Sequence, residues 1–166
     1  VVSLRRMANP GITVFLNDKD EFVVTEAARA INDDLSIVDA LPALGELLNT
    51  TKFTNEALIR RCISANLRVG TEKSLQHLVD YAVKESNPGD MRMEAISSVG
   101  VWAGPSVLDR VDGRFRGKVT RDTMSFRSHF GSSILGLLKN ADWQLRQQTV
   151  KAVNSIHLTD AEPILF

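Results

Sequence analysis

The sequence predicts an all-α fold in which about four helix pairs stack on one another, as in an α-solenoid. Three observations lead to this prediction. Apolar residues recur at helical spacing in one segment after another, and turns rich in Pro, Gly, Asn and Asp separate those segments. The segments also repeat with a period of about 32 to 35 residues. One helix pair cannot bury its apolar faces alone, so stacked neighbours would share a continuous core.

The first third of the chain begins with an interrupted helix. Residues 1–17 have helical character, but Asn-Pro-Gly at 9–11 breaks the segment because proline and glycine do not continue a helix. Asp20 and Glu21 suit the positive N-terminal end of the next helix. That helix is predicted to end at Asn-Asp-Asp, residues 32–34.

The next two helices are predicted from their start and stop residues. Ser36 is expected to be the N-cap of a helix that runs to about Leu48, with Pro42 tolerated near its start. A further helix is predicted over residues 54–69. Gly70 then ends it, because glycine readily adopts the left-handed conformation that follows many helices.

The second half contains the most distinctive stretch of the chain. Asn-Pro-Gly at 87–89 breaks a helix that starts near Thr71, and an acidic helix start with small residues follows. An irregular, charged insertion then separates this helix from the last two. The predicted segments are helices over 71–85, 90–103, 126–139 and 142–156, with a loop insertion at 104–125.

Internal alignment supports the repeat. Residues 10–17 align with residues 42–49 without a gap, and residues 133–140 fit the same frame. Pro163 would start the equivalent helix of a further unit, so we expect the chain to be a single repeat domain, residues 1–166, taken from a longer protein. The alternate helices align on Glu26, Arg61, Glu94 and Gln148, and small residues that allow close helix packing are Ala27, Ala30, Ala95, Ser98, Gly100 and Ala152.

Among solenoids, the chain most resembles HEAT repeats. Residues 90–100 and 143–153 are the clearest copies, with Arg92 and Arg146 at matching positions. The Trp-Leu-Gly-Tyr pattern of tetratricopeptide repeats and the Thr-Pro-Leu-His pattern of ankyrin repeats are missing from the sequence.

A narrower resemblance rests on residues 4–33, 93–96 and 102–115. These segments look like the HEAT segment of large bacterial membrane-bound dehydrogenase-type proteins, in which a β-propeller precedes the repeats and a cytochrome c module often follows. The resemblance implies a periplasmic or cell-envelope location. The sequence contains no Cys-x-x-Cys-His haem motif and no propeller, so no catalytic residue can be carried over.

Composition argues against several function classes. Twenty basic and twenty acidic residues cancel, whereas a nucleic-acid-binding protein usually has a basic excess. No apolar run approaches the roughly 18 residues of a membrane span, so direct membrane insertion is not expected. The single Cys62 excludes an internal disulfide and a zinc site built from cysteines alone.

No convincing active site emerges from the titratable residues. The three histidines, His77, His129 and His157, share no metal-ligand spacing, and a structural role is favoured. Cys62 lies on an apolar face and is interpreted as a small buried hydrophobe, because a nucleophile would need a nearby base. An acidic cluster at 18–21 is better explained by helix capping than by cation binding. We therefore expect no enzymatic activity, no cofactor and no metal.

The insertion is the best functional candidate. Residues 109–121 place five basic side chains around one aromatic residue, and loops that interrupt a solenoid often carry binding. The other interpretations are a solvated loop, or a loop that packs back over the solenoid edge. The predicted partner-binding residues are Trp102, Arg110, Arg114, Phe115, Arg116, Lys118 and Arg121.

The leading functional hypothesis is a non-catalytic HEAT-repeat scaffold. It would mediate protein–protein or inter-domain contacts within a multidomain bacterial oxidoreductase-like protein. The alternative is a HEAT-like enzyme of the bilin-lyase type that holds a chromophore on its concave face. Peptide binding in an armadillo-like groove would need a ladder of Asn and Trp on the second helices, which the sequence does not show.

Overall fold

The computed structural model describes residues 1–122 and 124–158, and within this part the protein is all-α, with 64% helix and no sheet. The chain forms two compact units: Val1–His77 with Arg110–Gly113, and Leu78–Asp109 with the described part of Arg114–Phe166. Each unit is described by itself. The helix predicted to begin at Pro163 lies outside the described residues.

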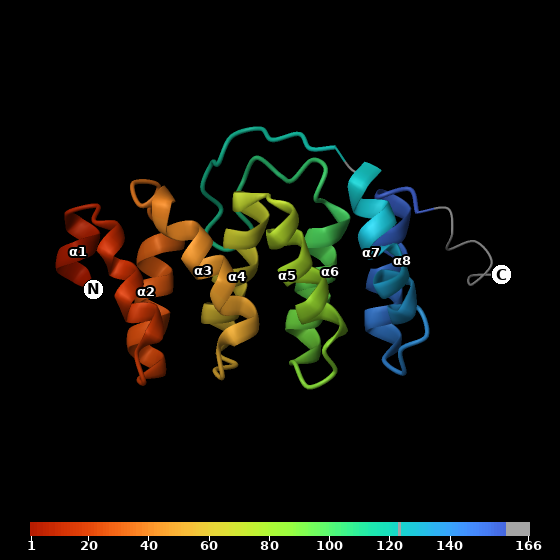
Figure 1. The fold of residues 1–166 in the computed structure, drawn as a ribbon, viewed down its shortest axis with the longest axis horizontal. Helices are drawn as coiled ribbons and strands as arrows, with labels where there is room; N and C mark the ends of the chain where they lie inside the picture. Colours follow the sequence, from red (N-terminus) through yellow and green to blue (C-terminus); the bar gives the residue numbers. More distant parts are fainter. Residues whose placement is uncertain (123, 159–166) are drawn as a thin grey trace. The chain divides into compact units, whose positions relative to one another are not determined.

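The first unit contains the helices of the N-terminal half (Figure 1). The expected break at residues 9–11 is confirmed, although the segment that follows it is a 3₁₀-helix. The unit boundary falls inside helix α5. The elements are α1 (Val2–Arg6), η1 (Pro10–Asn17), α2 (Glu21–Asn32), η2 (Val38–Ala40), α3 (Leu41–Thr50), α4 (Glu56–Val69) and α5 (Glu72–Val83).

Side-chain capping explains where several of these helices begin and end. The Asp20 carboxylate accepts a hydrogen bond from the Phe22 amide at the start of α2. Asn55 caps α4 in the same way, and Gly70 ends that helix with a left-handed φ of 70°. These contacts confirm the predicted start of α2 and the predicted end of α4.

The prediction that Ser36 caps the next helix is wrong. The Ser36 amide and hydroxyl both donate to the Asp34 carboxylate, at 3.0 and 2.7 Å, so the serine belongs to the preceding turn. Because that turn continues into η2, α3 begins only at Leu41, with Pro42 in its first turn. The serine hydroxyl donates to the nearby Asp34 carboxylate, and it does not accept a hydrogen bond from the amides of a helix start, as an N-cap would.

The core of the first unit combines apolar packing with one buried amide. Asn66 on α4 is 1% exposed, and its Nδ2 donates to the carbonyl oxygens of Gly45 and Cys62 at 2.9 and 3.0 Å. Its Oδ1 therefore faces the His77 Nδ1, 3.1 Å away, which acts as the donor. This amide links α3, α4 and the start of α5. Fully buried apolar residues around these helices include Ile31, Leu44, Leu48, Leu58, Ile59 and Ile63.

The second unit is built on close contact between α6 (Gly89–Gly100) and α8 (Trp143–Ser155), with α7 (Met124–Leu137) also packed on α8 (Figure 1). A Cβ added at Gly100 would lie 2.9 Å from the Ala152 Cα, so glycine is needed for this approach. Asp142 is the N-cap of α8, which begins at Trp143, one residue after the predicted start at residue 142. Helix α6 ends three residues before its predicted end at Ala103, and α7 begins two residues before its predicted start at Phe126.

The matching arginines of the two clearest sequence copies make similar contacts in the second unit. Arg92, in the first turn of α6, donates from Nε to the Ala82 carbonyl oxygen at 2.8 Å. Arg146, in the first turn of α8, donates from Nη1 to the carbonyl oxygens of Asn140 and Ala141 at 2.6 and 2.9 Å. Each guanidinium thus binds the backbone at the end of the preceding helix or in the turn after it.

Candidate interaction loop

The loop between α6 and α7 is the candidate functional site (Figure 1). The sequence predicts an irregular insertion at 104–125, and the described residues 104–122 contain no helix. The loop does contain a short hairpin. Its two sides, residues 107–109 and 114–116, belong to the second unit, whereas the residues that join them, Arg110–Gly113, belong to the first.

Two backbone hydrogen bonds close the hairpin. The Asp109 amide donates to the Arg114 carbonyl oxygen at 2.8 Å, and the Arg116 amide donates to the Val107 carbonyl oxygen at 2.7 Å. Leu108 and Phe115 therefore form an antiparallel bridge at a non-hydrogen-bonded position. At such positions the two side chains lie on one face and are closest together. Both are exposed, Leu108 to 50% and Phe115 to 67%.

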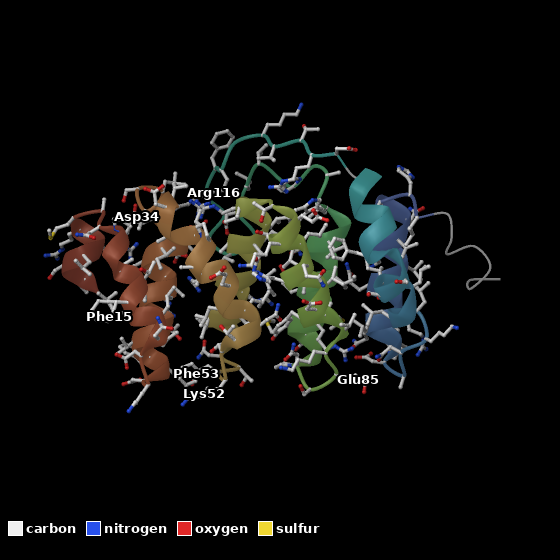
Figure 2. The ribbon with its side chains drawn as sticks, viewed as in Figure 1. Phe15, Asp34, Lys52, Phe53, Glu85 and Arg116 are labelled. Carbon is white, nitrogen blue, oxygen red and sulfur yellow. The ribbon has the colours of Figure 1, made fainter. Side chains whose placement is uncertain are left out.

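The opposite face of the hairpin carries a buried ion pair. Arg116 is labelled in Figure 2. Its Nε lies 3.1 Å from the Asp109 Oδ2, and the Arg116 and Asp109 side chains are 8% and 1% exposed. Strand alternation places these residues on the side away from Leu108 and Phe115. Breaking a buried pair by removing one partner costs about 3–5 kcal/mol. The ion pair therefore determines which face of the hairpin is buried.

The base of the loop is held by Arg121 and Trp102. The Arg121 amide donates to the Ala103 carbonyl oxygen at 2.8 Å, and its Nη1 donates to the Trp102 carbonyl oxygen at 2.9 Å. The guanidinium also lies over the Trp102 ring, 4.6 Å from its centre. Trp102 is 3% exposed, and desolvation lowers the pKa of Arg121 from its ordinary value. These contacts make the buried Trp102 the anchor for the base of the loop.

The structure divides the predicted partner-binding residues into three groups. Arg116 and Arg121 make internal contacts that hold the loop, as does the buried Trp102. Arg110 is exposed and belongs to the first unit. The exposed members on the second unit are Arg114, Phe115 and Lys118.

Leu108 is an exposed apolar residue that sequence reasoning missed. Asp-Gly at 112–113 is a common hairpin turn signal, and it could have indicated a hairpin in this part of the loop, although not its register. Gly113 has a left-handed φ of +71°, as hairpin turns require. The missed pairing matters because it converts one exposed aromatic residue into an apolar pair.

Other candidate residues have structural roles. Cys62 is fully buried, and desolvation raises the pKa of its thiol, which disfavours the nucleophilic thiolate. Asp18 and Asp20 accept hydrogen bonds from nearby backbone amides, and Glu21 accepts one from the Asn55 amide at 3.2 Å. Across the described residues, no three His, Cys, Asp or Glu side chains are grouped to hold a metal. The His129 side chain lies outside the described part.

An open groove lies in the first unit, between η1 and α3. Its volume is about 540 Å³, within the range of small-molecule sites. Small and polar residues line much of it, and Glu46 at its side forms a salt bridge with Lys73. The lining residues are Gly11, Thr13, Val14, Leu16, Asn17, Ala43, Glu46, Leu47 and Thr50.

The comparisons with known proteins do not assign the chain to a family. No protein-family model matches the sequence, and a search of curated proteins gives no significant match. Among the described helices, none combines the length and the apolar character needed to span a bilayer.

Proposed function

We propose that this chain is a non-catalytic helical scaffold of the HEAT-repeat type that binds another protein, or a neighbouring domain of its own chain, through the loop at 104–122. The observation that carries the proposal is the hairpin. It exposes Leu108 and Phe115 on one face, while a buried Asp109–Arg116 pair fixes the other.

The internal contacts that hold the loop in place favour a binding role over that of a solvated linker. Ordering side chains and loops on association costs free energy, and a surface that is already ordered avoids part of that cost. Exposed aromatic residues in ordered surroundings are frequent binding hot spots. The buried ion pair and the cation–π contact at the base of the loop support such an ordered surface.

Two further observations support the HEAT-repeat part of the proposal. The α-helices from α2 onward are 10 to 14 residues long, as paired repeat helices are, and side-chain caps begin α2, α4 and α8. Arg92 and Arg146, which match in sequence, also make matching contacts with the backbone that precedes their helices. On the resemblance to bacterial dehydrogenase-type proteins, the parent would be a multidomain cell-envelope protein.

Photo-crosslinking in the organism that encodes the protein tests the proposal. A photoreactive residue would replace Lys118 on the loop or, as a matched control, Lys19, which is also an exposed lysine but lies on the first unit. We expect one recurrent protein or domain to be crosslinked from position 118 and not from position 19. Equal crosslinking from both positions, or none from position 118, would contradict loop-mediated binding.

The groove between η1 and α3 favours a second candidate, small-molecule binding of the bilin-lyase type. Its volume suits a chromophore, and Thr13, Asn17 and Thr50 offer polar groups. Titration with biliverdin, followed by its visible absorption, tests this candidate. A saturable spectral change that Ala43→Trp abolishes would support it, whereas an unchanged spectrum would leave the groove without this role.

A further inference from the structure

We propose that Asp112 is a site of spontaneous modification, at which aspartate rearranges to isoaspartate through a cyclic succinimide and thereby opens the loop hairpin. Asp112 precedes Gly113 within residues 110–113, which join the two sides of the hairpin. The inference goes beyond the proposed function and does not rest on it, because it concerns the covalent chemistry of the turn and not a partner of the loop.

The sequence singles out this aspartate. Asp112 is the only aspartate that precedes a glycine, and no asparagine precedes one. A succinimide forms when the backbone nitrogen of the following residue attacks the side-chain carboxyl carbon, and a Cβ on that residue hinders the attack. Glycine has no Cβ. At every other aspartate of the chain, the attacking nitrogen would belong to a residue that carries a side chain.

The structure leaves the attacking nitrogen accessible. Gly113 is exposed, and a Cβ added to it would meet no atom within 4 Å apart from its own neighbours in the chain. Its backbone amide donates no hydrogen bond to any of the described residues, whereas the amides of Asp109 and Arg116 donate across the hairpin. Neither Asp112 nor Gly113 belongs to a helix. No hydrogen bond of the Gly113 amide to the described residues therefore has to break before the ring closes.

The rearrangement needs no reagent other than water. The Gly113 nitrogen bonds to the Asp112 Cγ, and the amide proton and the hydroxyl group of the carboxylic acid leave together as water. Ring closure is favoured because both reacting groups belong to adjacent residues. Water then adds to one of the two ring carbonyl groups. Breaking the bond from nitrogen to Cγ restores aspartate. Breaking the bond from nitrogen to the Asp112 carbonyl carbon leaves the chain running through Cβ and Cγ, which is isoaspartate.

Isomerisation would change the hairpin itself. The isoaspartyl link adds a carbon atom to the backbone of the segment that joins the two paired sides. The register of a hairpin depends on the length and conformation of its turn. The hydrogen bond from the Asp109 amide to the Arg114 carbonyl oxygen lies next to the turn, so it depends most directly on that length. The isoaspartyl form should therefore lose this bond and, with it, the burial of the Asp109–Arg116 ion pair.

Ageing of the purified protein in neutral buffer tests the inference. The total isoaspartate would be measured by enzymatic methylation with labelled S-adenosylmethionine, and its position by mass spectrometry of peptides with electron-transfer fragmentation. We expect isoaspartate to form at Asp112 about tenfold faster than at Asp18, which is also exposed enough to compare but is followed by a lysine. Equal rates at the two positions, or no isoaspartate at 112, would overturn the inference.

Two variants test the roles of the two residues. Asp112→Glu keeps the negative charge but would need a larger ring, so it should remove the isoaspartate at this position. Gly113→Asn supplies a Cβ while tolerating the positive φ of +71°, and it should slow the reaction about tenfold. An unchanged rate in Gly113→Asn, or unchanged total methylation in Asp112→Glu, would contradict the assignment.

Limited digestion with trypsin tests the opening of the hairpin. Cleavage after Arg116, whose side chain is buried in the ion pair, should be several-fold faster in aged protein than in fresh protein. Cleavage after Lys52, an exposed lysine outside the loop, is the control and should not change. Equal cleavage after Arg116 in isoaspartate-containing and fresh protein would overturn the opening of the hairpin. None of these outcomes bears on whether the fresh protein binds a partner through the loop.

Discussion

Two helix contacts, one in each unit, depend on a glycine in different ways. On α3 of the first unit, a Cβ added at Gly45 would lie 2.9 Å from the Asn66 Oδ1, a side-chain atom. On α6 of the second unit, a Cβ added at Gly100 would lie 2.9 Å from the Ala152 Cα, a backbone atom. The distances are equal, but the obstacles are different.

The difference shows what each contact is built from. An amide side chain can rotate away from an added methyl group, but Asn66 would then lose hydrogen bonds to Gly45 and His77 in a buried site. A backbone Cα can move only if helix α8 moves with it. An added methyl group at Gly45 is therefore opposed by the loss of hydrogen bonds, and one at Gly100 by steric exclusion. Equivalent substitutions at the two glycines should lower the free energy of unfolding by different amounts.

Gly100→Val should have the largest effect. Overpacking against backbone is expected to destabilise the second unit by about 3 kcal/mol, and Gly100→Ala by about 2 kcal/mol. Urea unfolding followed by the fluorescence of Trp102 would measure the change. Gly136→Ala on α7 is the control, since no atom lies within 4 Å of the added Cβ, and it should be neutral or stabilising. A Gly100→Ala protein as stable as the original would contradict steric exclusion.

Asn66→Leu should be the next largest change. It leaves the Gly45 carbonyl and the His77 Nδ1 without their buried amide partner, at a cost of about 2 kcal/mol. Cys62 is buried on the same helix, so its modification by a thiol reagent requires opening of the first unit. The modification rate should rise about 30-fold in the variant. An unchanged rate would mean that the amide adds little to this unit.

Gly45→Ala should cost about 1 kcal/mol, because Asn66 must shift and weaken its hydrogen bonds. In an Asn66→Ala background that cost should vanish, as a double-mutant cycle would show. The matching cycle in the second unit combines Gly100→Ala with Ala152→Gly. Rescue there should be only partial, because the Ala152 Cα remains in place. Full recovery of stability in the second-unit double mutant would contradict the proposed difference between the two contacts.

Glu46→Gln should have the smallest effect. Glu46 follows Gly45 on α3, and its hydrogen bond and attraction to Lys73 lower the pKa of the carboxyl group. Both side chains are more than half exposed, so the pair should contribute no more than about 0.5 kcal/mol. A lowered carboxyl pKa adds stability above the ordinary glutamate pKa of about 4.3, and that stability disappears as the pH falls below it. Unfolding at pH 7 and pH 3 measures the difference, and a larger loss at pH 3 would have the wrong sign.

The sequence predicted helix positions well where a single residue decides the boundary. Asp20 and Gly70 have local chemistry that suits one role, and the structure confirms both. Ser36 failed because the serine had a competing acceptor in Asp34, which the capping rule does not weigh. A serine hydroxyl can donate to a neighbouring carboxylate, whereas the Asp20 carboxylate can only accept, so the aspartate was the more predictable cap.

The sequence predicted where the loop lies, but not which of its side chains are exposed. Its charge and length marked it as the insertion, but Arg114, Arg116 and Arg121 are equivalent in composition. The hairpin register turns Arg116 towards Asp109, and the position of Trp102 holds Arg121. Register depends on pairing between residues on the two sides of the turn, which helical periodicity does not report.

The proposed binding function depends on a hairpin that is held in one conformation. Backbone ¹⁵N relaxation of residues 107–109 and 114–116 tests it most directly. A fixed hairpin should have backbone order parameters near those of the helices, about 0.8 or above. These order parameters should fall clearly in the Arg116→Ala variant. Order parameters below about 0.6 in the unsubstituted protein would show a mobile linker and contradict the claim.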